Sequence, residues 1–514
     1  MNPRFGSLAT LKAALLMTGS TYVTYAIGLL VSALIARHMG PEDFGRYAYI
    51  VWLVGVLVIV CNNGLTTTGI RFVAEALGGG SNQLAATIHG WLFRRQWLSI
   101  AAVILCFLAL FPLLKPAGWV ETVWLFNLVV VVSLAAKSLY LFQISIAKGH
   151  GRFSVEAYST ILVSVANAAL VLMLYLLDAS LPAYLALFTA TSLGYYAVAA
   201  LMLRRGSPAP LHSRIDGELL SRVNTHLLWT VVLTLVGAFG GASAEIYLLN
   251  RWVGAAEVGF FVIAVSLTRG GIDMVSSGLT SVLMPVMGHA FGAGGRSRVD
   301  TILSDALRYF QFLGLLAAGT GAFWAEAIVL LVYGPEYTSV TSIVRWMLVA
   351  AGFALGGGAI GALLSTTDNQ RLRAVFASIA LLVSVLAAVA LIPAYGLAGA
   401  VVAHVAVRLV LYVIGLILIV RLMAIRLPLR ELCRLILASS LAAAAAWMCT
   451  LVLQGLWVGV AAGFAYAALF LACTRYMGVW KEKDIHQVVV LTGQYPRLLG
   501  WTRAYLDRWM QQLS

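Results

Sequence analysis

Basic side chains lie well away from the ends of apolar runs that are long enough to cross a lipid bilayer at Lys137, Arg269 and Arg408. A cation at membrane depth costs free energy and therefore marks a candidate functional site. The strongest candidate is the segment Arg269-Gly-Gly-Ile-Asp273. Arg269 lies about eleven residues, or roughly 16 Å, into a helix expected to begin near Val258, close to the bilayer midplane.

Arg269 and Asp273 are four residues apart, so an α-helix would put them on one face. Two interpretations follow. Either the two side chains line a polar cavity, or they form an internal salt bridge that neutralises both charges. The Gly-Gly pair between them is expected to loosen the helix.

A later apolar run repeats the four-residue spacing with His404 and Arg408. These cations either line a cavity, or Arg408 donates hydrogen bonds to main-chain carbonyl groups of a neighbouring helix. Lys137 lies nearer one end of its run and either extends toward the polar interface or lines the cavity. Glu245 and Glu326, near the ends of their runs, are either coupling-ion sites or solvated interfacial residues.

Motifs of hydrolases and nucleotide-binding proteins are absent from the sequence, which has no HExxH, GxSxG or P-loop pattern. The five cysteines all lie in apolar runs and none has CxxC spacing, so they are interpreted as small buried hydrophobic residues. The sequence therefore predicts a protein that is not an enzyme and has no cofactor and no metal site.

The composition indicates the elements that carry these residues. The chain is 61% hydrophobic and only 11% charged, and its mean hydropathy is +0.93. Soluble domains have about 25% charged residues. The apolar runs have the length of helices rather than of barrel strands, so we predict an all-α polytopic membrane protein. We expect about fourteen transmembrane helices, at about 13–36, 46–70, 91–114, 119–146, 155–177, 181–203, 227–250, 258–288, 306–332, 343–365, 374–393, 397–420, 434–453 and 456–475.

The net charge of +14 is distributed unevenly between the two sides that these spans define. Termini and alternate loops on one side carry 26 Lys and Arg residues, and the opposite side carries five. The positive-inside rule then puts both termini in the cytoplasm. The basic charge is thereby explained without a nucleic-acid partner.

A duplication organises the chain. Arg37 and Arg251 are 214 residues apart, and the same offset pairs Gly40 with Gly254 and then Gly45 with Gly259. The register holds without a gap as far as residues 80 and 294. In each copy an apolar helix ends at the Arg, a glycine turn follows, and a second helix begins. These turns are interpreted as a scaffold, in which Arg caps the end of spans one and seven, or as an outward gate.

The repeat copies begin six spans apart and so have the same orientation. We therefore expect two pseudo-symmetric six-helix lobes, 1–203 and 227–425, joined by a cytoplasmic linker over 204–226. Two extra transmembrane helices follow within 426–477. A cytoplasmic tail over 478–514 has apolar residues every fourth position from Trp501 to Leu513, which is typical of an amphipathic interfacial helix. Packing against loops of the protein itself is the alternative.

The repeated turn also carries a family resemblance. Residues 36–47 (Ala-Arg-x-x-Gly-Pro-Glu-x-Phe-Gly-x-Tyr) resemble the first periplasmic turn of bacterial polysaccharide transporters, within the multidrug/oligosaccharidyl-lipid/polysaccharide exporter superfamily. The O-antigen (lipid-linked oligosaccharide) flippases are the most similar type. Residues 333–337 (Tyr-Gly-Pro-Glu-Tyr) and 395–400 (Tyr-Gly-Leu-Ala-Gly-Ala) resemble two further family turns. The fourteen-span layout resembles that of lipid II flippases, whereas many O-antigen flippases have twelve.

The resemblance implies two lobes around a central cavity that opens alternately to each side of a bacterial inner membrane. The implied cargo is an undecaprenyl-diphosphate-linked oligosaccharide, with membrane lipids and polysaccharide assembly proteins as further partners. Cations such as Arg269 would replace the hydration of its phosphates. A cation-coupled multidrug exporter of the same fold is an alternative, although Asp273 is the only deep acid. A membrane-embedded glycan polymerase or ligase is a third, although no large outside loop is expected.

Overall fold

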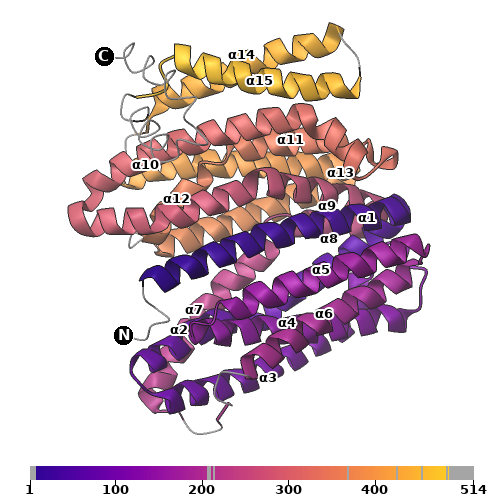
Figure 1. Cartoon of the computed structure of the whole chain (residues 1–514), viewed down its shortest axis with the longest axis vertical. Helices are drawn as coiled ribbons and strands as arrows, with labels where there is room; N and C mark the ends of the chain where they lie inside the picture. The colour runs from indigo at the N-terminus through magenta and orange to yellow at the C-terminus, as the bar shows by residue number, and fades with distance from the viewer. Residues whose placement is uncertain are drawn as a thin grey trace. The chain divides into compact units, whose positions relative to one another are not determined.

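Regular structure in the described residues is entirely helical (Figure 1). The computed structural model describes residues 7–204, 210–211, 215–366, 370–423, 427–452, 455–481 and 484. Its elements are α1 (Ser7–Asn62), α2 (Leu65–Gly78), α3 (Asn82–Leu114), α4 (Val123–Gly149), α5 (Ser154–Leu176), α6 (Leu181–Arg204), α7 (Gly217–Phe239), α8 (Ser243–Trp252), α9 (Ala255–Thr268), the π-helix η2 (Arg269–Asp273), α10 (Met274–Val332), the 3-10 helix η3 (Pro335–Tyr337), α11 (Val340–Phe353), α12 (Gly357–Thr366), α13 (Gln370–Met423), α14 (Leu429–Val452) and α15 (Leu456–Tyr476).

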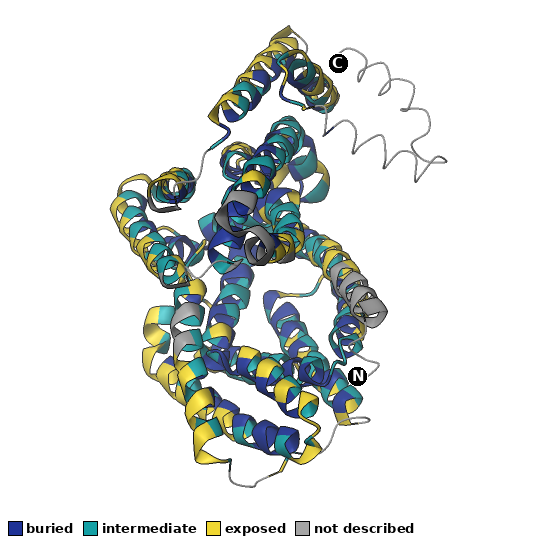
Figure 2. Cartoon of the chain, turned by 90° about the vertical axis from the view of Figure 1, so that its left-hand side faces the viewer, coloured by how far each residue is buried: buried dark blue, intermediate teal, exposed yellow. Residues whose placement is uncertain are grey.

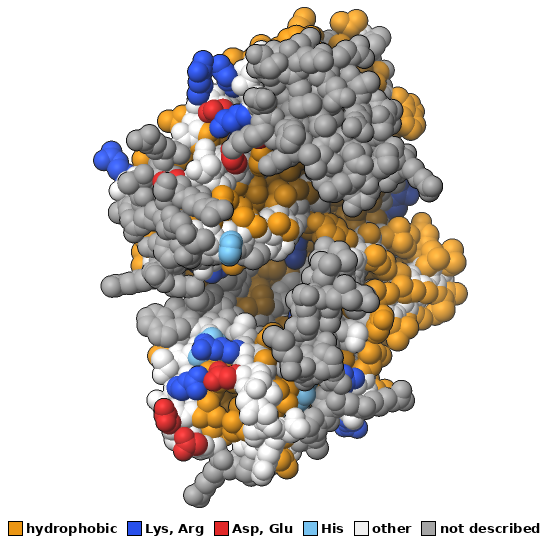
Figure 3. Space-filling model, turned by 60° about the vertical axis from the view of Figure 1, so that its left-hand side comes forward, with side chains coloured by type: hydrophobic (Ala, Val, Ile, Leu, Met, Phe, Trp, Pro, Cys, Tyr) orange, Lys and Arg blue, Asp and Glu red, His pale blue; other side chains and the backbone are white. Residues whose placement is uncertain are grey.

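Ten helices in the described part of the chain are long and apolar enough to cross a membrane. The number is eleven if α11 and α12, which are bent by 46° at their junction, form one span. The most apolar 18-residue stretch of α3 has a mean hydropathy of 2.6, yet only 11% of that stretch is buried. Hydrophobic side chains gather in a broad patch at the right of Figure 3. The prediction of an all-α polytopic membrane protein is therefore confirmed.

The count of fourteen spans stays a prediction, because two of the ten apolar helices are long enough to cross twice. Gly19–Asn62 has 44 residues and Leu372–Arg421 has 50. Each contains a glycine with non-helical backbone, Gly40 (φ 71°) and Gly396 (φ 56°). A positive φ is accessible to glycine at little cost, so the chain turns there and continues as a second helical segment. After Gly40 this restart is favoured by Pro41, which suits the first turn of a helix.

Contacts divide the chain into two compact units. Unit 1 comprises Met1–Gly270, Ile328–Ile343 and Arg371–Val407, and unit 2 comprises Gly271–Ala327, Val344–Gln370 and Arg408–Ser514. The two six-helix lobes of the sequence analysis stay a prediction. Residues 205–209 and 212–214 of the predicted linker lie outside the described residues, as does the predicted amphipathic tail apart from 478–481 and 484.

In unit 1, the buried core near the α2 helix joins α2, α3, α4 and α7. Phe72, Leu92 and Phe142 are fully or almost fully buried there. Burial follows one face of each helix, with exposed residues on the other (Figure 2). This pattern leaves the apolar outer faces for lipid, while the packed inner faces hold the helices together.

In unit 2, a buried cluster packs α14 and α15 against α10. The Tyr466 hydroxyl on α15 donates a hydrogen bond to the Leu315 carbonyl on α10 (2.9 Å) and lies 2.9 Å from the Ser439 hydroxyl on α14. Tyr466 and Phe470 are completely buried. The two extra C-terminal helices are therefore fixed to α10 by a shared core and by hydrogen bonds.

Candidate functional site

The two copies of the repeated turn meet inside unit 1. A Cβ atom added to Gly259 on α9 would lie 3.0 Å from the Pro41 carbonyl oxygen and 3.2 Å from the Gly45 Cα. A Cβ added to Gly45 would collide with the Ala255 carbonyl group. Equivalent glycines of the two copies thus allow the α1 and α9 backbones to touch directly. Sequence reasoning paired these residues but did not predict their contact.

Arg37 caps a helix, but not the one expected from the sequence. Its Nε donates to the Val332 carbonyl oxygen (2.8 Å), and its Nη2 donates to the carbonyl oxygens of Leu330 (3.3 Å) and Leu331. These acceptors form the C-terminal end of α10, where a cation suits the helix dipole. The Tyr337 hydroxyl reinforces this junction by donating to the Ala36 carbonyl oxygen (2.9 Å).

Arg251 has a different environment from Arg37, although the two are equivalent in the repeat. It lies in the last turn of its own helix, α8, and is exposed. Gly254 directly precedes α9 with an extended backbone (φ 165°), whereas Gly40 has φ 71°. The duplicated sequence therefore adopts two local structures, and only the first copy caps α10.

The Arg269–Asp273 segment forms the π-helix η2 between α9 and α10. Single π-helical turns inside α-helices are frequent at functional sites. Gly270 lets α1 approach this turn, because an added Cβ would lie 2.7 Å from the Tyr25 hydroxyl oxygen. That hydroxyl donates to the Ser266 carbonyl oxygen, one turn earlier on α9. Tyr25 was not predicted, and its place in an apolar first span gave no specific signal.

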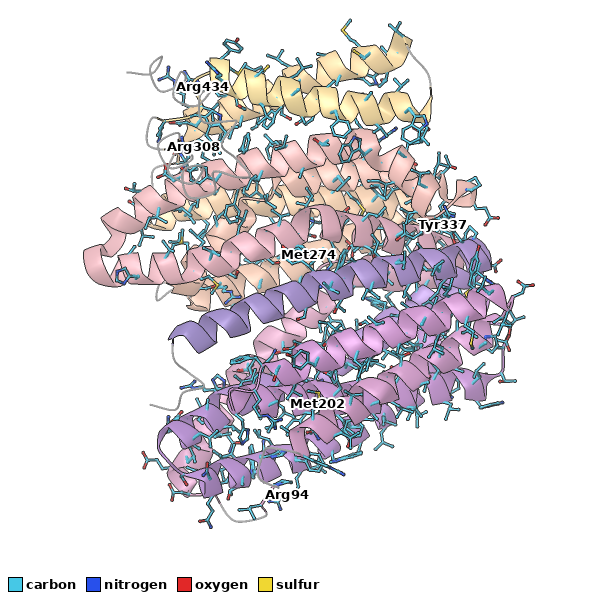
Figure 4. All side chains as sticks on the ribbon, in the orientation of Figure 1. Arg94, Met202, Met274, Arg308, Tyr337 and Arg434 are labelled. Carbon is cyan, nitrogen blue, oxygen red and sulfur yellow. The ribbon has the colours of Figure 1, made fainter. Side chains whose placement is uncertain are left out.

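Within unit 2, Asp273 forms an ion pair with Arg408 of α13, whose Nη2 donates to the Asp273 carboxylate. The side chains are 25% exposed for Arg408 and 39% exposed for Asp273. The neighbouring residue Met274 is labelled in Figure 4. The predicted salt bridge between Arg269 and Asp273 is not among the ion pairs of the described residues. A π-helix hydrogen-bonds from i to i+5, so residues four apart are no longer stacked as in an α-helix.

Arg269 is consequently exposed and has no ion-pair partner among the described residues. It lies in the apolar segment Ala255–Met284, one of the candidate membrane spans. A guanidinium has five N–H donors, which suit an oxyanion. The geometry therefore favours the interpretation of Arg269 as a ligand-binding cation.

His404 pairs with a buried acid within unit 1. Its Nδ1 lies 3.4 Å from the Glu245 Oε1 on α8, and the Phe261 ring contacts the imidazole edge-on at a centroid distance of 5.8 Å. Glu245 is completely buried, and neither carboxylate oxygen accepts a hydrogen bond from a described residue. Glu245 is therefore not a solvated interfacial residue. A buried carboxylate with so few stabilising contacts needs either a neighbouring cation or protonation.

Lys137 on α4 lies over the Phe188 ring of α6, with its Nζ 4.1 Å from the ring centroid. This cation–π contact joins two helices of unit 1. Among the described contacts, Lys137 has no acidic partner and touches neither Arg269 nor His404. The structure thus resolves the five predicted side chains into two ion pairs, a cation–π contact and one exposed arginine.

A buried arginine that sequence reasoning did not single out anchors the segment after α15. Arg308 of α10 is 1% exposed, and its guanidinium contacts the Asp484 carboxylate (2.7 Å) and the Val479 carbonyl oxygen (2.9 Å). Tyr309 also donates to Asp484, and Arg434 donates to the Gly478 carbonyl oxygen (3.0 Å). Figure 4 labels Arg308 and Arg434 on α10 and α14.

Comparison with known proteins identifies the class of the chain. A profile of the family described as "Polysaccharide biosynthesis protein" matches residues 10–291, more than half of the chain. The chain belongs to this family. Among curated protein sequences, none is significantly similar to it.

Solved structures show the same fold at low sequence identity. The lipid II flippase MurJ in an inward closed conformation has a TM-score of 0.70 at 12% identity, covering 90% of this chain and 98% of that one. An inward-facing multidrug resistance MATE transporter of the MOP superfamily has a TM-score of 0.65 at 17% identity, covering 77% and 93%. A mutant of the Vibrio cholerae MATE transporter VcmN has a TM-score of 0.57 at 16% identity, covering 79% and 94%. These structures show a shared fold, and together with the family profile they confirm the predicted resemblance.

Proposed function

We propose that this protein is a flippase that moves undecaprenyl-diphosphate-linked oligosaccharide repeat units from the cytoplasmic to the periplasmic leaflet for polysaccharide export. The observation that carries the proposal is Arg269, an exposed guanidinium on a π-helical turn within an apolar span. Membership of the polysaccharide biosynthesis family supports a glycan cargo. The fold shared with a lipid II flippase supports a lipid-linked one.

The chemistry of such a cargo is a problem of desolvation. Its isoprenoid tail remains in lipid, but diphosphate and sugar hydroxyl groups lose hydration in the membrane. A guanidinium compensates a phosphate through short, charge-assisted and often bidentate hydrogen bonds. Within unit 2, the Asp273 and Arg408 side chains are both partly exposed, so a phosphate could compete with the carboxylate for the Arg408 guanidinium.

The proposed cycle is alternating access of two six-helix lobes in a bacterial inner membrane, with both termini cytoplasmic. The excess of Lys and Arg on one side supports this orientation. The direct contact of Gly45 with Gly259 suits a gate on the periplasmic side, because it joins the start of the second span of one expected lobe to the start of the second span of the other. We therefore propose that the protein is a transporter and not an enzyme.

A second candidate is a cation-coupled multidrug exporter of the same fold. The pair of the buried Glu245 with His404 favours it, because a buried acid is suited to binding a proton or a metal cation. The exposed Arg269 opposes it, because it would repel cationic drugs. A glycan polymerase or ligase has no specific observation in its favour.

The deciding experiment deletes the gene and analyses undecaprenyl-linked sugars by mass and by leaflet. Accumulation of one complete repeat unit on the cytoplasmic side is the expected result, and it would also name the cargo. Normal polysaccharide export together with lost resistance to a toxic cation would refute the flippase and favour the exporter.

A further inference from the structure

A cavity of about 450 Å³ lies in unit 2, where α10 and α11 meet the two extra helices α14 and α15. Its lining includes Glu326, Arg345, Trp447 and Thr450. This volume is within the range of small-molecule sites in proteins. The cavity contains none of the residues assigned above to the cargo.

The wall that α15 contributes is held firmly on α10. Trp324 on α10 donates from Nε1 to the Val460 carbonyl oxygen on α15 (3.0 Å). A Cβ added to Gly459 would lie 3.1 Å from the Phe323 carbonyl oxygen, and one added to Gly463 would collide with the Trp324 indole. Small residues at these positions allow the two helices to approach closely, so the cavity is a built feature of the fold.

One pair of opposite charges dominates the polar side of the cavity. Arg345 Nη2 lies 3.2 Å from Glu326 Oε2, and Arg345 Nε donates to the Ala322 carbonyl oxygen (3.1 Å). The two side chains remain 50% exposed for Glu326 and 45% exposed for Arg345. Each therefore keeps hydrogen-bonding capacity for a ligand, and the two charges sum to zero. Because this ion pair has no net charge, it favours a ligand that carries both a positive and a negative charge. A ligand that is only an anion or only a cation is favoured less.

The surroundings of the cavity are apolar. Trp447 lines the cavity and is 59% exposed, and Leu451, one helical turn further along α14, is 62% exposed. Trp457, next to the lining residue Leu456, is 72% exposed. All three lie near the ends of membrane-spanning helices that meet at Gly455. Exposed Trp residues at such ends are typical of the headgroup region of a bilayer.

We propose that this cavity binds the headgroup of a zwitterionic phospholipid that carries a primary ammonium, with its acyl chains along α14. The Glu326 carboxylate would accept from the ammonium, and the Arg345 guanidinium would donate to the phosphate. The Trp447 ring adds a surface for the cation. A neutral sugar would also satisfy the two charges, but it has no chain to cover Leu451. The site does not depend on the flippase assignment, and under the proposed topology it lies in the periplasmic leaflet.

Native mass spectrometry of the full-length protein tests this proposal. The purified protein is incubated with equal amounts of phosphatidylethanolamine, phosphatidylcholine and phosphatidylglycerol that have identical acyl chains. The expected result is preferential retention of one phosphatidylethanolamine. Phosphatidylcholine lacks the ammonium N–H donors, and phosphatidylglycerol lacks the cation. Because only phosphatidylethanolamine forms the charge-assisted hydrogen bond, we expect it to be preferred over each of them by about tenfold.

The variants Glu326→Gln and Arg345→Gln are expected to abolish this preference. Trp447→Leu, which keeps an apolar side chain, is expected to weaken it. Glu75→Gln is the matched control and should leave it unchanged, because Glu75 forms a similarly exposed pair with Arg222 (2.8 Å; 44% and 51% exposed) in unit 1. Unchanged melting temperature and elution profile identify variants that still fold.

Three results would overturn the proposal. Equal retention of the three lipids would show that the headgroup is not recognised. Loss of the preference in Glu75→Gln as well would show that it arises elsewhere. Displacement of the retained lipid by an excess of lactose would reassign the cavity to sugars.

Discussion

At the scale of single residues, Arg269 differs from Arg408 and His404 because no described acid pairs with it. We expect Arg269→Ala to reduce polysaccharide export at least about tenfold, because one charge-assisted hydrogen bond is worth about 1.5–3 kcal/mol. Arg269→Lys should keep part of the activity, since it preserves the charge but not the bidentate geometry. Export is measured in the deletion strain at matched protein level. Arg94→Ala, which removes an exposed arginine of α3, is the control. Full activity of Arg269→Ala would exclude a role in cargo binding.

The pair of Glu245 and His404 makes a second prediction at this scale. Removing the cation from a buried ion pair leaves an uncompensated charge and costs about 3–5 kcal/mol. We therefore expect His404→Ala to lower the melting temperature more than Glu245→Gln does. The double variant should be more stable than His404→Ala alone, because the buried charge is then absent. Thermal unfolding of the four proteins in one detergent measures this cycle. Simple additivity would indicate that Glu245 is already neutral in the folded protein.

At the scale of elements, Arg308 connects α10 to the segment that follows α15. Burial alone would raise the pKa of Asp484, but hydrogen bonds from Tyr309, from Arg308 and from the Lys481 amide outweigh it and hold the pKa below its usual 3.8. Since the folded-state pKa is the lower one, this stabilisation is present above about pH 4 and is lost in stronger acid.

We therefore expect the segment around Asp484 to stay docked from pH 5 to pH 8 and to be released in stronger acid. Hydrogen exchange of peptides covering 477–484 measures the docking. Asp484→Asn should increase exchange there at neutral pH, because it removes the partner of the buried Arg308. Glu218→Gln, an exposed carboxylate at the start of α7, should have no effect. Release between pH 6 and pH 7 would contradict the assignment to Asp484.

The comparison of sequence with structure is also clearest for elements. Composition and run length predicted helices in a membrane, because lipid leaves the backbone few alternatives. The turns were predicted from glycine residues in the sequence, and the chain does turn at Gly40 and Gly396. The pairing at η2 was missed for two physical reasons. A π-helix does not follow the 3.6-residue period, and Arg408 is 135 residues from Asp273 in the sequence. A single sequence contains no signal for such a distant partner.

At the scale of the whole molecule, the two repeat copies are in contact within unit 1, whereas the proposed cycle requires such contacts to break. Its contacts join the first expected lobe to the second, through Gly45 with Gly259 and through Arg37 with the end of α10. Asn250 of α8 adds a further link, accepting from the Ala117 amide (2.7 Å) and donating to the Lys115 carbonyl oxygen (3.0 Å). Alternating access requires that such links break once in every cycle.

A cross-link at this point should therefore stop transport. Cysteines introduced as Ala117→Cys and Asn250→Cys, joined by a short thiol reagent with a cleavable disulfide, are expected to abolish flipping of a lipid-linked oligosaccharide in proteoliposomes. Reduction of the reagent should restore it. Each single variant treated in the same way is the control, because the chain has five native cysteines. If flipping continues in the cross-linked protein, the halves need not separate here, and the glycine contact is a permanent scaffold rather than a gate.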